Sequence, residues 1–183
     1  MKVIGNSKRL LFAATLATAF LAAPALAKDD VVGAAGDVRG KVVARRRETV
    51  RDLAAGAGLR LRDLVETDVE SFARLYFSGG TIVNLGSKAK LKIDKFVAET
   101  GGLLQLGEGA MMFDRADDLP KIKLTVRSRF GLIAVRGTKF FAGPSKGVFG
   151  IFVERGEVQV TAAGVSRSLK AGDGVDIAKP GQP

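Results

Sequence analysis

The 183-residue chain contains no cysteine, no histidine and no tryptophan, and it has one tyrosine and five prolines. The absence of cysteine excludes disulfides, thiolate metal sites and lipid attachment through a cysteine. The absence of histidine excludes catalytic triads that use imidazole as the base and zinc sites with imidazole ligands. A hydrophobic fraction of 46% and a charged fraction of 26% are nevertheless typical of a globular chain with one domain.

The N-terminal segment has the parts of a secretory signal peptide. Three basic residues precede an apolar run over residues 10–23, and Pro24 leads into the cleavage signature Ala25-Leu26-Ala27. We therefore predict a signal peptide over residues 1–27, cleavage after Ala27 and a periplasmic mature protein. A membrane anchor is the alternative, but the run is shorter than the about 20 apolar residues that span a bilayer. The mature chain is accordingly predicted to have no transmembrane anchor.

Basic residues outnumber acidic ones by 29 to 19, so the formal net charge is +10, and removal of the three basic residues in the predicted signal leaves +7. The excess basic residues are spread along the chain, and Arg45-Arg46-Arg47 is the densest group of them. The aromatic residues lie in apolar strand patterns, whereas nucleic-acid binders combine such charge with exposed aromatics or a recognition helix. We predict no nucleic-acid partner. The expected partner is an envelope protein or an anionic envelope glycan, and the oligomeric state stays open.

Apolar and polar residues alternate with a period of two in several segments, which is typical of half-buried strands. The clearest segment is 88–93, where the polar face has Lys88, Lys90 and Lys92 and the apolar face has Ala89, Leu91 and Ile93. Such a lysine ladder either solubilises a face of a sheet or protects an edge strand from pairing. Residues 148–153 form a denser apolar run, which predicts a strand buried on both sides.

Turn signals recur roughly every 8 to 12 residues, which is the spacing of an all-β domain. Residues 49–61 could form a short helix, although Gly56 and Gly58 weaken it. We predict one all-β domain over residues 28–178, for which the family resemblance described below favours a compact β-solenoid-like coil. A β-sandwich or a partly open barrel is the alternative. Residues 179–183 are predicted to be a flexible tail.

Several motifs together point to a family. Residues 133–141 read Ile-Ala-Val-Arg-Gly-Thr-Lys-Phe-Phe, and they are followed by the apolar run and by Gly156-Glu157-Val158. With a closing motif at 169–175, the chain resembles the FecR family over most of residues 33–177. The resemblance implies a β-solenoid-like extracytoplasmic module. Such modules are common in regulators that relay the state of a TonB-dependent outer-membrane transporter to a cytoplasmic sigma factor. No sigma-binding segment precedes the predicted signal, so from the family we transfer to this chain only the expectation of an exported module.

Arg136, Thr138 and Lys139 are the candidate binding residues. Arg and Lys offer charge-assisted hydrogen bonds to an anion, and Gly137 would let a ligand approach the backbone. A structural role explains the same residues without a ligand, because Gly137 permits a special turn dihedral and Arg136 could stack or pair internally. We favour the structural role.

Four acidic residues lie close together in the sequence, at Asp63, Glu66, Asp68 and Glu70. Carboxylates can hold a hard cation, but the alternating pattern of a calcium loop is missing, so turns are favoured and no metal or other cofactor is predicted. We predict a non-catalytic module that acts in sensing, binding or scaffolding in the envelope, with a link to TonB-dependent transport signalling. The alternatives are an envelope carbohydrate-active enzyme that uses paired carboxylates and a purely structural envelope protein.

Overall fold

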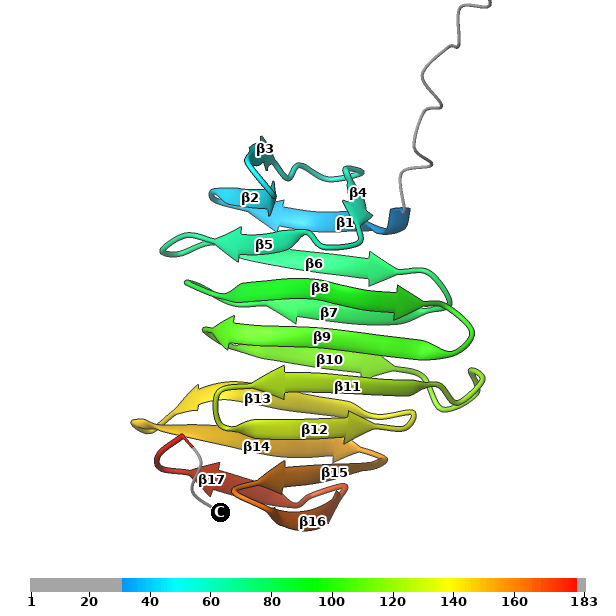
Figure 1. The fold of residues 1–183 in the computed structure, drawn as a ribbon, viewed down its shortest axis with the longest axis vertical. Helices are drawn as coiled ribbons and strands as arrows, with labels where there is room; N and C mark the ends of the chain where they lie inside the picture. The colour runs from blue at the N-terminus through cyan, green and yellow to red at the C-terminus, as the bar shows by residue number, and fades with distance from the viewer. Residues whose placement is uncertain (1–30, 181–183) are drawn as a thin grey trace, which may run out of the picture.

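The computed structural model describes residues 31–180 (Figure 1). These residues form strands and turns and no helix, so the all-β prediction is confirmed for this part of the chain. None of them forms a helix that is long and apolar enough to cross a membrane. The predicted signal peptide at 1–27 and the last residues of the predicted tail lie outside the described range.

The strands form two sheets. In order across the sheet, sheet A contains β4 (Gly58–Arg60), β1 (Val31–Arg39), β6 (Phe72–Phe77), β7 (Thr81–Leu85), β10 (Met111–Arg115), β13 (Lys139–Ser145), β14 (Val148–Arg155) and β17 (Gly174–Ile177). Sheet B contains β3 (Thr49–Asp52), β2 (Val42–Arg46), β5 (Leu64–Thr67), β8 (Lys90–Val97), β9 (Gly101–Glu108), β11 (Lys123–Ser128), β12 (Gly131–Val135), β15 (Glu157–Ala162) and β16 (Val165–Lys170). The edge strands are therefore β3 and β4 at the N-terminal end of the molecule and β16 and β17 at the C-terminal end.

The chain passes from one sheet to the other after every one or two strands, and it advances along the long axis of the molecule from β1 to β17 (Figure 1). Among the described strands, β9 and β11 pair in parallel, and the other pairings are antiparallel. The parallel pair arises because β10, which lies between these two strands in the sequence, belongs to sheet A. Neither sheet closes into a barrel within this range. The β-sandwich alternative therefore fits the fold, and the solenoid-like coil is not confirmed.

The core lies between the two sheets and is built from rows of inward side chains that face one another across strands. In sheet A one row consists of Leu75, Val83, Phe113, Phe140 and Val153, all fully buried. The rings of Phe113 and Phe140 stack with their centroids 5.3 Å apart. Burial of such side chains contributes about 1.5–3 kcal/mol each, so these rows supply much of the driving force for folding.

The register predicted for residues 88–93 is confirmed. Ala89, Leu91 and Ile93 are fully buried, and the intervening lysines point outward. However, β8 lies between β5 and β9 in the middle of sheet B, so the lysines solubilise a face and do not guard an edge.

The short helix considered for residues 49–61 does not form. These residues form β3, a turn and β4, because each strand pairs with a longer neighbour, β2 or β1. The apolar run at 148–153 is not buried on both sides, since Phe152 on β14 points outward and is 49% exposed. Sheet B covers the inner face of β14, whereas no strand covers its outer face in the described structure.

Candidate functional site

The candidate residues Arg136, Thr138 and Lys139 lie where the chain leaves β12 and enters β13. Arg136 is exposed and has no acidic partner within residues 31–180. Thr138 is fully buried, and its hydroxyl finds no hydrogen-bond partner in the described structure. The Lys139 ammonium pairs with the Glu154 carboxylate at 2.6 Å. The three side chains point in different directions and do not line one pocket.

The backbone at this crossing matches the structural role. Gly137 has a φ of 66°, in the left-handed region that side chains with a Cβ rarely adopt. The Thr138 carbonyl accepts a hydrogen bond of 3.0 Å from the Arg115 amide, which fixes the crossing to β10. The expected internal pairing of Arg136 is wrong, because its side chain points to solvent.

The four clustered acidic residues separate in space. Asp63 is fully buried and accepts hydrogen bonds from the Arg51 guanidinium and a backbone amide. Glu66 pairs with Arg45 at 3.1 Å, and the Asp68 carboxylate accepts a hydrogen bond from the next amide in a turn. Among residues 31–180, no group of three or more acidic side chains could hold a metal ion. The turn and pairing roles therefore account for Asp63, Glu66 and Asp68.

The outer face of sheet B carries many cationic side chains, and we name it the basic face. Its cations are Arg45, Lys90, Lys92, Lys95, Lys123, Arg127 and Arg136. They point outward because the strands alternate: on β11, Leu124 and Val126 are buried and the residues between and beside them face solvent. The basic face thus follows from the strand register.

Three of these cations have acidic partners on the same face. Arg45 pairs with Glu66 at 3.1 Å, and Lys90 pairs with Glu108 at 3.0 Å. Lys92 lies 3.6 Å from Asp94. The hydrogen bond from Glu108 and its negative charge raise the pKa of Lys90 above its usual value, so Lys90 remains protonated at neutral pH.

The other four cations, Lys95, Lys123, Arg127 and Arg136, are exposed and have no acidic partner in the described part of the chain. They lie on β8, on β11 and just after β12, in the middle of sheet B. Cross-strand register places Arg127 opposite Gln105, which in turn lies opposite Lys92. Two strand spacings of about 4.8 Å separate Lys92 from Arg127, roughly 10 Å in all. The centre of the basic face is therefore an unneutralised cationic surface.

A family model described as FecR protein matches residues 63–159, which is more than half of the chain. The chain belongs to the FecR family. The matched segment runs from the turn before β5 into β15, so it includes the four unpaired cations of the basic face. The resemblance read from the sequence motifs is thus confirmed.

Solved structures show the same fold. Two crystal structures of a protein described as an anti-sigma factor from Parabacteroides distasonis, at 1.65 and 2.50 Å resolution, align with TM-scores of 0.53 and 0.54 and sequence identities of 17% and 18%. Each alignment covers 65% of this chain and 57% or 56% of the other. The FecR chain therefore spans little more than half the length of these structural relatives. No curated protein matches it.

The sequence interpretation missed a buried arginine in the FecR-matched segment. Arg115 ends β10, is 2% exposed, and follows Met111 and Phe113 at inward positions. Its guanidinium donates hydrogen bonds of 3.2 and 2.8 Å to the Pro120 carbonyl and one of 3.0 Å to the Thr81 hydroxyl. Burial lowers the pKa of Arg115 from its usual value. The period-two alternation of β10 was the signal that could have placed this side chain inside.

Proposed function

We propose that this FecR-family chain is an exported, non-catalytic module of the cell envelope and that its basic face binds an anionic envelope glycan. The observation that carries the proposal is the group of four exposed cations without acidic partners at the centre of sheet B. Exposed cations that are not neutralised locally attract anionic polymers. Family membership supports a regulatory or signalling context for this binding.

A flat cationic sheet suits a polymer better than a small molecule. The cations stand on a continuous surface that crosses β8, β11 and β12, with the small or uncharged side chains of Gln105, Thr125 and Ala134 between them. A polymer with regularly spaced phosphates or carboxylates can contact several of these cations at once, and each exposed contact contributes only about 0–1 kcal/mol. The affinity is therefore distributed and depends on salt.

The family context adds a sensing or scaffold role. Held on an envelope glycan, the module would present its other surfaces to protein partners, including components of TonB-dependent transport signalling. The N-terminal signal features support export, and the positive charge of the mature chain favours an anionic surface.

The test uses dextran sulfate and polygalacturonate as anionic probes and neutral dextran as the control polymer. Binding to the mature chain is measured at about 50 and 300 mM salt, because screening over about 10 Å or less should weaken it. The variant Lys95→Gln, Lys123→Gln, Arg127→Gln is expected to bind the anionic polymers about tenfold more weakly. Its matched control removes the same charge from sheet A and its β13–β14 turn, through Arg74→Gln, Lys139→Gln and Lys146→Gln.

Binding of neutral dextran with equal affinity, or an equal loss in both triple variants, would contradict the proposal. Binding of dextran sulfate should also stay constant between about pH 6 and 9, because the chain has no histidine, the side chain that changes its charge in this range. The raised pKa of Lys90 extends its protonated range to higher pH.

A further inference from the structure

The C-terminal end of the sandwich has an edge strand that separates two hollows. The outer hollow, of about 380 Å³, lies on the outer face of sheet A and is formed by β13, β14 and β17. The inner hollow, of about 200 Å³, lies between the sheets and is formed by β15, β16 and β17. Val175 and Asp176 of β17 line both hollows.

The backbone of β17 is free along one side. The strand pairs with β14 from Gly174 to Ile177, and no described strand pairs with its other side. An edge of this kind presents unpaired N–H and C=O groups that can bind another strand. Many natural sheets protect such an edge with a lysine or a proline, but β17 has neither.

The inner hollow is lined by apolar side chains, by one cation, Arg167, and by Asp176 of β17. The inward row of sheet B passes from Ile133 to Val160, and its last position, on edge strand β16, is Arg167. Arg167 lines the hollow beside Val165 and has no acidic partner in the described part of the chain. Val165 is 43% exposed although it faces the interior side of its strand. At this end of the sandwich, the Val165 side chain is therefore left partly uncovered, and the inward Arg167 has no acidic partner in the described structure.

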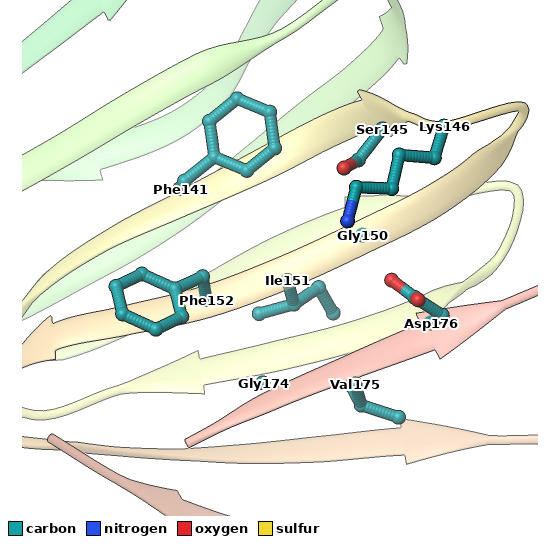
Figure 2. Close-up of a pocket in the computed structure, with 9 residues that line it drawn as sticks. All are labelled: Phe141, Ser145, Lys146, Gly150, Ile151, Phe152, Gly174, Val175 and Asp176. Atoms are coloured by element: carbon teal, nitrogen blue, oxygen red, sulfur yellow. The ribbon is translucent and has the colours of Figure 1, made fainter. Parts of the chain in front are cut away.

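The outer hollow has an aromatic part and a polar part. Figure 2 shows the rings of Phe141 and Phe152 at one end, and Lys146 and Asp176 at the other. Gly174 lies directly opposite Phe152 in the strand register and has no side chain to cover that ring. A side chain from a strand on the far side of β17 could reach Phe152 across this glycine, as aromatic residues do beside edge glycines.

We propose that the free edge of β17 binds an extended segment of a protein partner, which adds as a further strand of sheet A. Its inward side chains are apolar, with one acidic residue that pairs with Arg167. Its outward side chains include one that packs on Phe152 beside Gly174. Main-chain hydrogen bonds supply affinity in such strand addition, and the hollows for alternate side chains supply specificity.

Charge disfavours a second copy of this chain as the occupant. A two-fold pairing of β17 with β17 would bring the two inner hollows together, with an Arg167 at each, while Asp176, which also lines them, alternates to the outer side of β17 between Val175 and Ile177. Two like charges that face each other in this way destabilise the contact. The unpaired Arg167 favours an acidic partner segment.

The experiment uses the full mature chain as the target and selects binding peptides from a displayed library of random sequences of about ten residues. We expect enriched peptides with apolar residues at alternate positions and an acidic residue in register with them. Binding should fall at least about tenfold in Arg167→Glu and should be restored by a basic residue at the acidic peptide position. Arg127→Glu, on the basic face, is the matched control and should leave peptide binding unchanged.

Hydrogen exchange with the selected peptide bound should protect residues 174–177. Three results would overturn the proposal: no enrichment, equal loss in Arg167→Glu and Arg127→Glu, or protection over the basic face. Self-association of the free chain that Arg167→Glu abolishes would assign the edge to a second copy and would also overturn it. Because the basic face is tested with polysaccharides and other variants, failure here leaves the glycan proposal intact.

Discussion

At the N-terminal end of the sandwich, the chain crosses from β3 to β4, and the side chains of Leu53 and Leu59 there are at most 1% exposed. At the C-terminal end, the crossing from β16 to β17 leaves residues 171–173 exposed, as residues 54–56 are at the N-terminal crossing, and Val165 at the start of β16 is 43% exposed. Both ends use the same kind of crossing between edge strands. They differ in whether the crossing contributes side chains that close the core.

Side-chain polar contacts differ between the two ends, whereas backbone hydrogen bonds fix both crossings. Bonds of 2.8 Å join Ala35 of β1 to Ala57 and Gly56 at the N-terminal crossing, and bonds of 2.8 and 2.9 Å join Val153 of β14 to Gly172 and Asp173 at the C-terminal crossing. The buried Asp63 carboxylate holds Arg51 of β3 and the Arg60 amide of β4 together. At the C-terminal end the corresponding inward charge, Arg167, has no acidic partner in the described structure. A closed end serves stability, whereas an open end is available for binding.

The largest expected effect comes from truncating the core at the closed end. Leu59→Ala should lower the free energy of unfolding by roughly 2–5 kcal/mol, because it removes a fully buried side chain. Val165→Ala, at the open end, should lower it by less than about 1 kcal/mol. Urea denaturation of both variants measures the two values. Equal losses would show that the ends are equally closed.

A smaller effect should follow from removing the buried charge at the closed end. Asp63→Asn deprives Arg51 of its anionic partner and should lower the free energy of unfolding by about 1–3 kcal/mol. The control is Asp173→Asn, because the exposed Asp173 carboxylate accepts a hydrogen bond of 2.8 Å from the Lys170 amide and has no cationic partner in the described structure. That control should change the stability by about 0.5 kcal/mol or less. A larger loss of stability in Asp173→Asn than in Asp63→Asn would contradict the difference between the two ends.

The smallest effect is a gain at the open end. Arg167→Leu completes the inward row that passes through Ile133 and Val160, so it should raise the free energy of unfolding by up to about 1 kcal/mol. Arg127→Leu places the same side chain on the solvent side of sheet B and should give no gain. Thermal unfolding of the two variants separates these outcomes. A loss of stability in Arg167→Leu would mean that Arg167 already has a stabilising role.

The period-two alternation predicted much of this structure. It placed Ala89, Leu91 and Ile93 inside and the two lysines between them outside, because one face of a strand is apolar and the other charged. It could not place Phe152, since both faces of residues 148–153 are apolar and only the partner sheet decides which is covered. Likewise, no local pattern determines that the chain changes sheets after every one or two strands. The solenoid expectation rested on family resemblance and not on strand pairing.

The candidate site was less predictable than the fold. Arg136, Thr138 and Lys139 are adjacent in the sequence, but a crossing between sheets sends their side chains in different directions. The basic face, by contrast, joins residues from strands far apart in the sequence, so its unpaired cations emerge only after the strands are paired. The inward position of Arg167 could have been predicted, because Val165 and Leu169, two residues before and after it on β16, are apolar and lie on the same face of the strand.

Amide hydrogen exchange of the free protein tests the difference between the two ends most directly. The amides of Leu53, Gly56 and Ala57, which donate hydrogen bonds to backbone carbonyls, should exchange only through global unfolding, whereas the strand amides of residues 165–170 and 174–177 should exchange through local opening, at least about a hundredfold faster. The comparison is made within one sample, so differences in concentration or pH cannot produce it. Equal protection of the two segments would contradict an open C-terminal end and remove the structural basis for strand addition at β17.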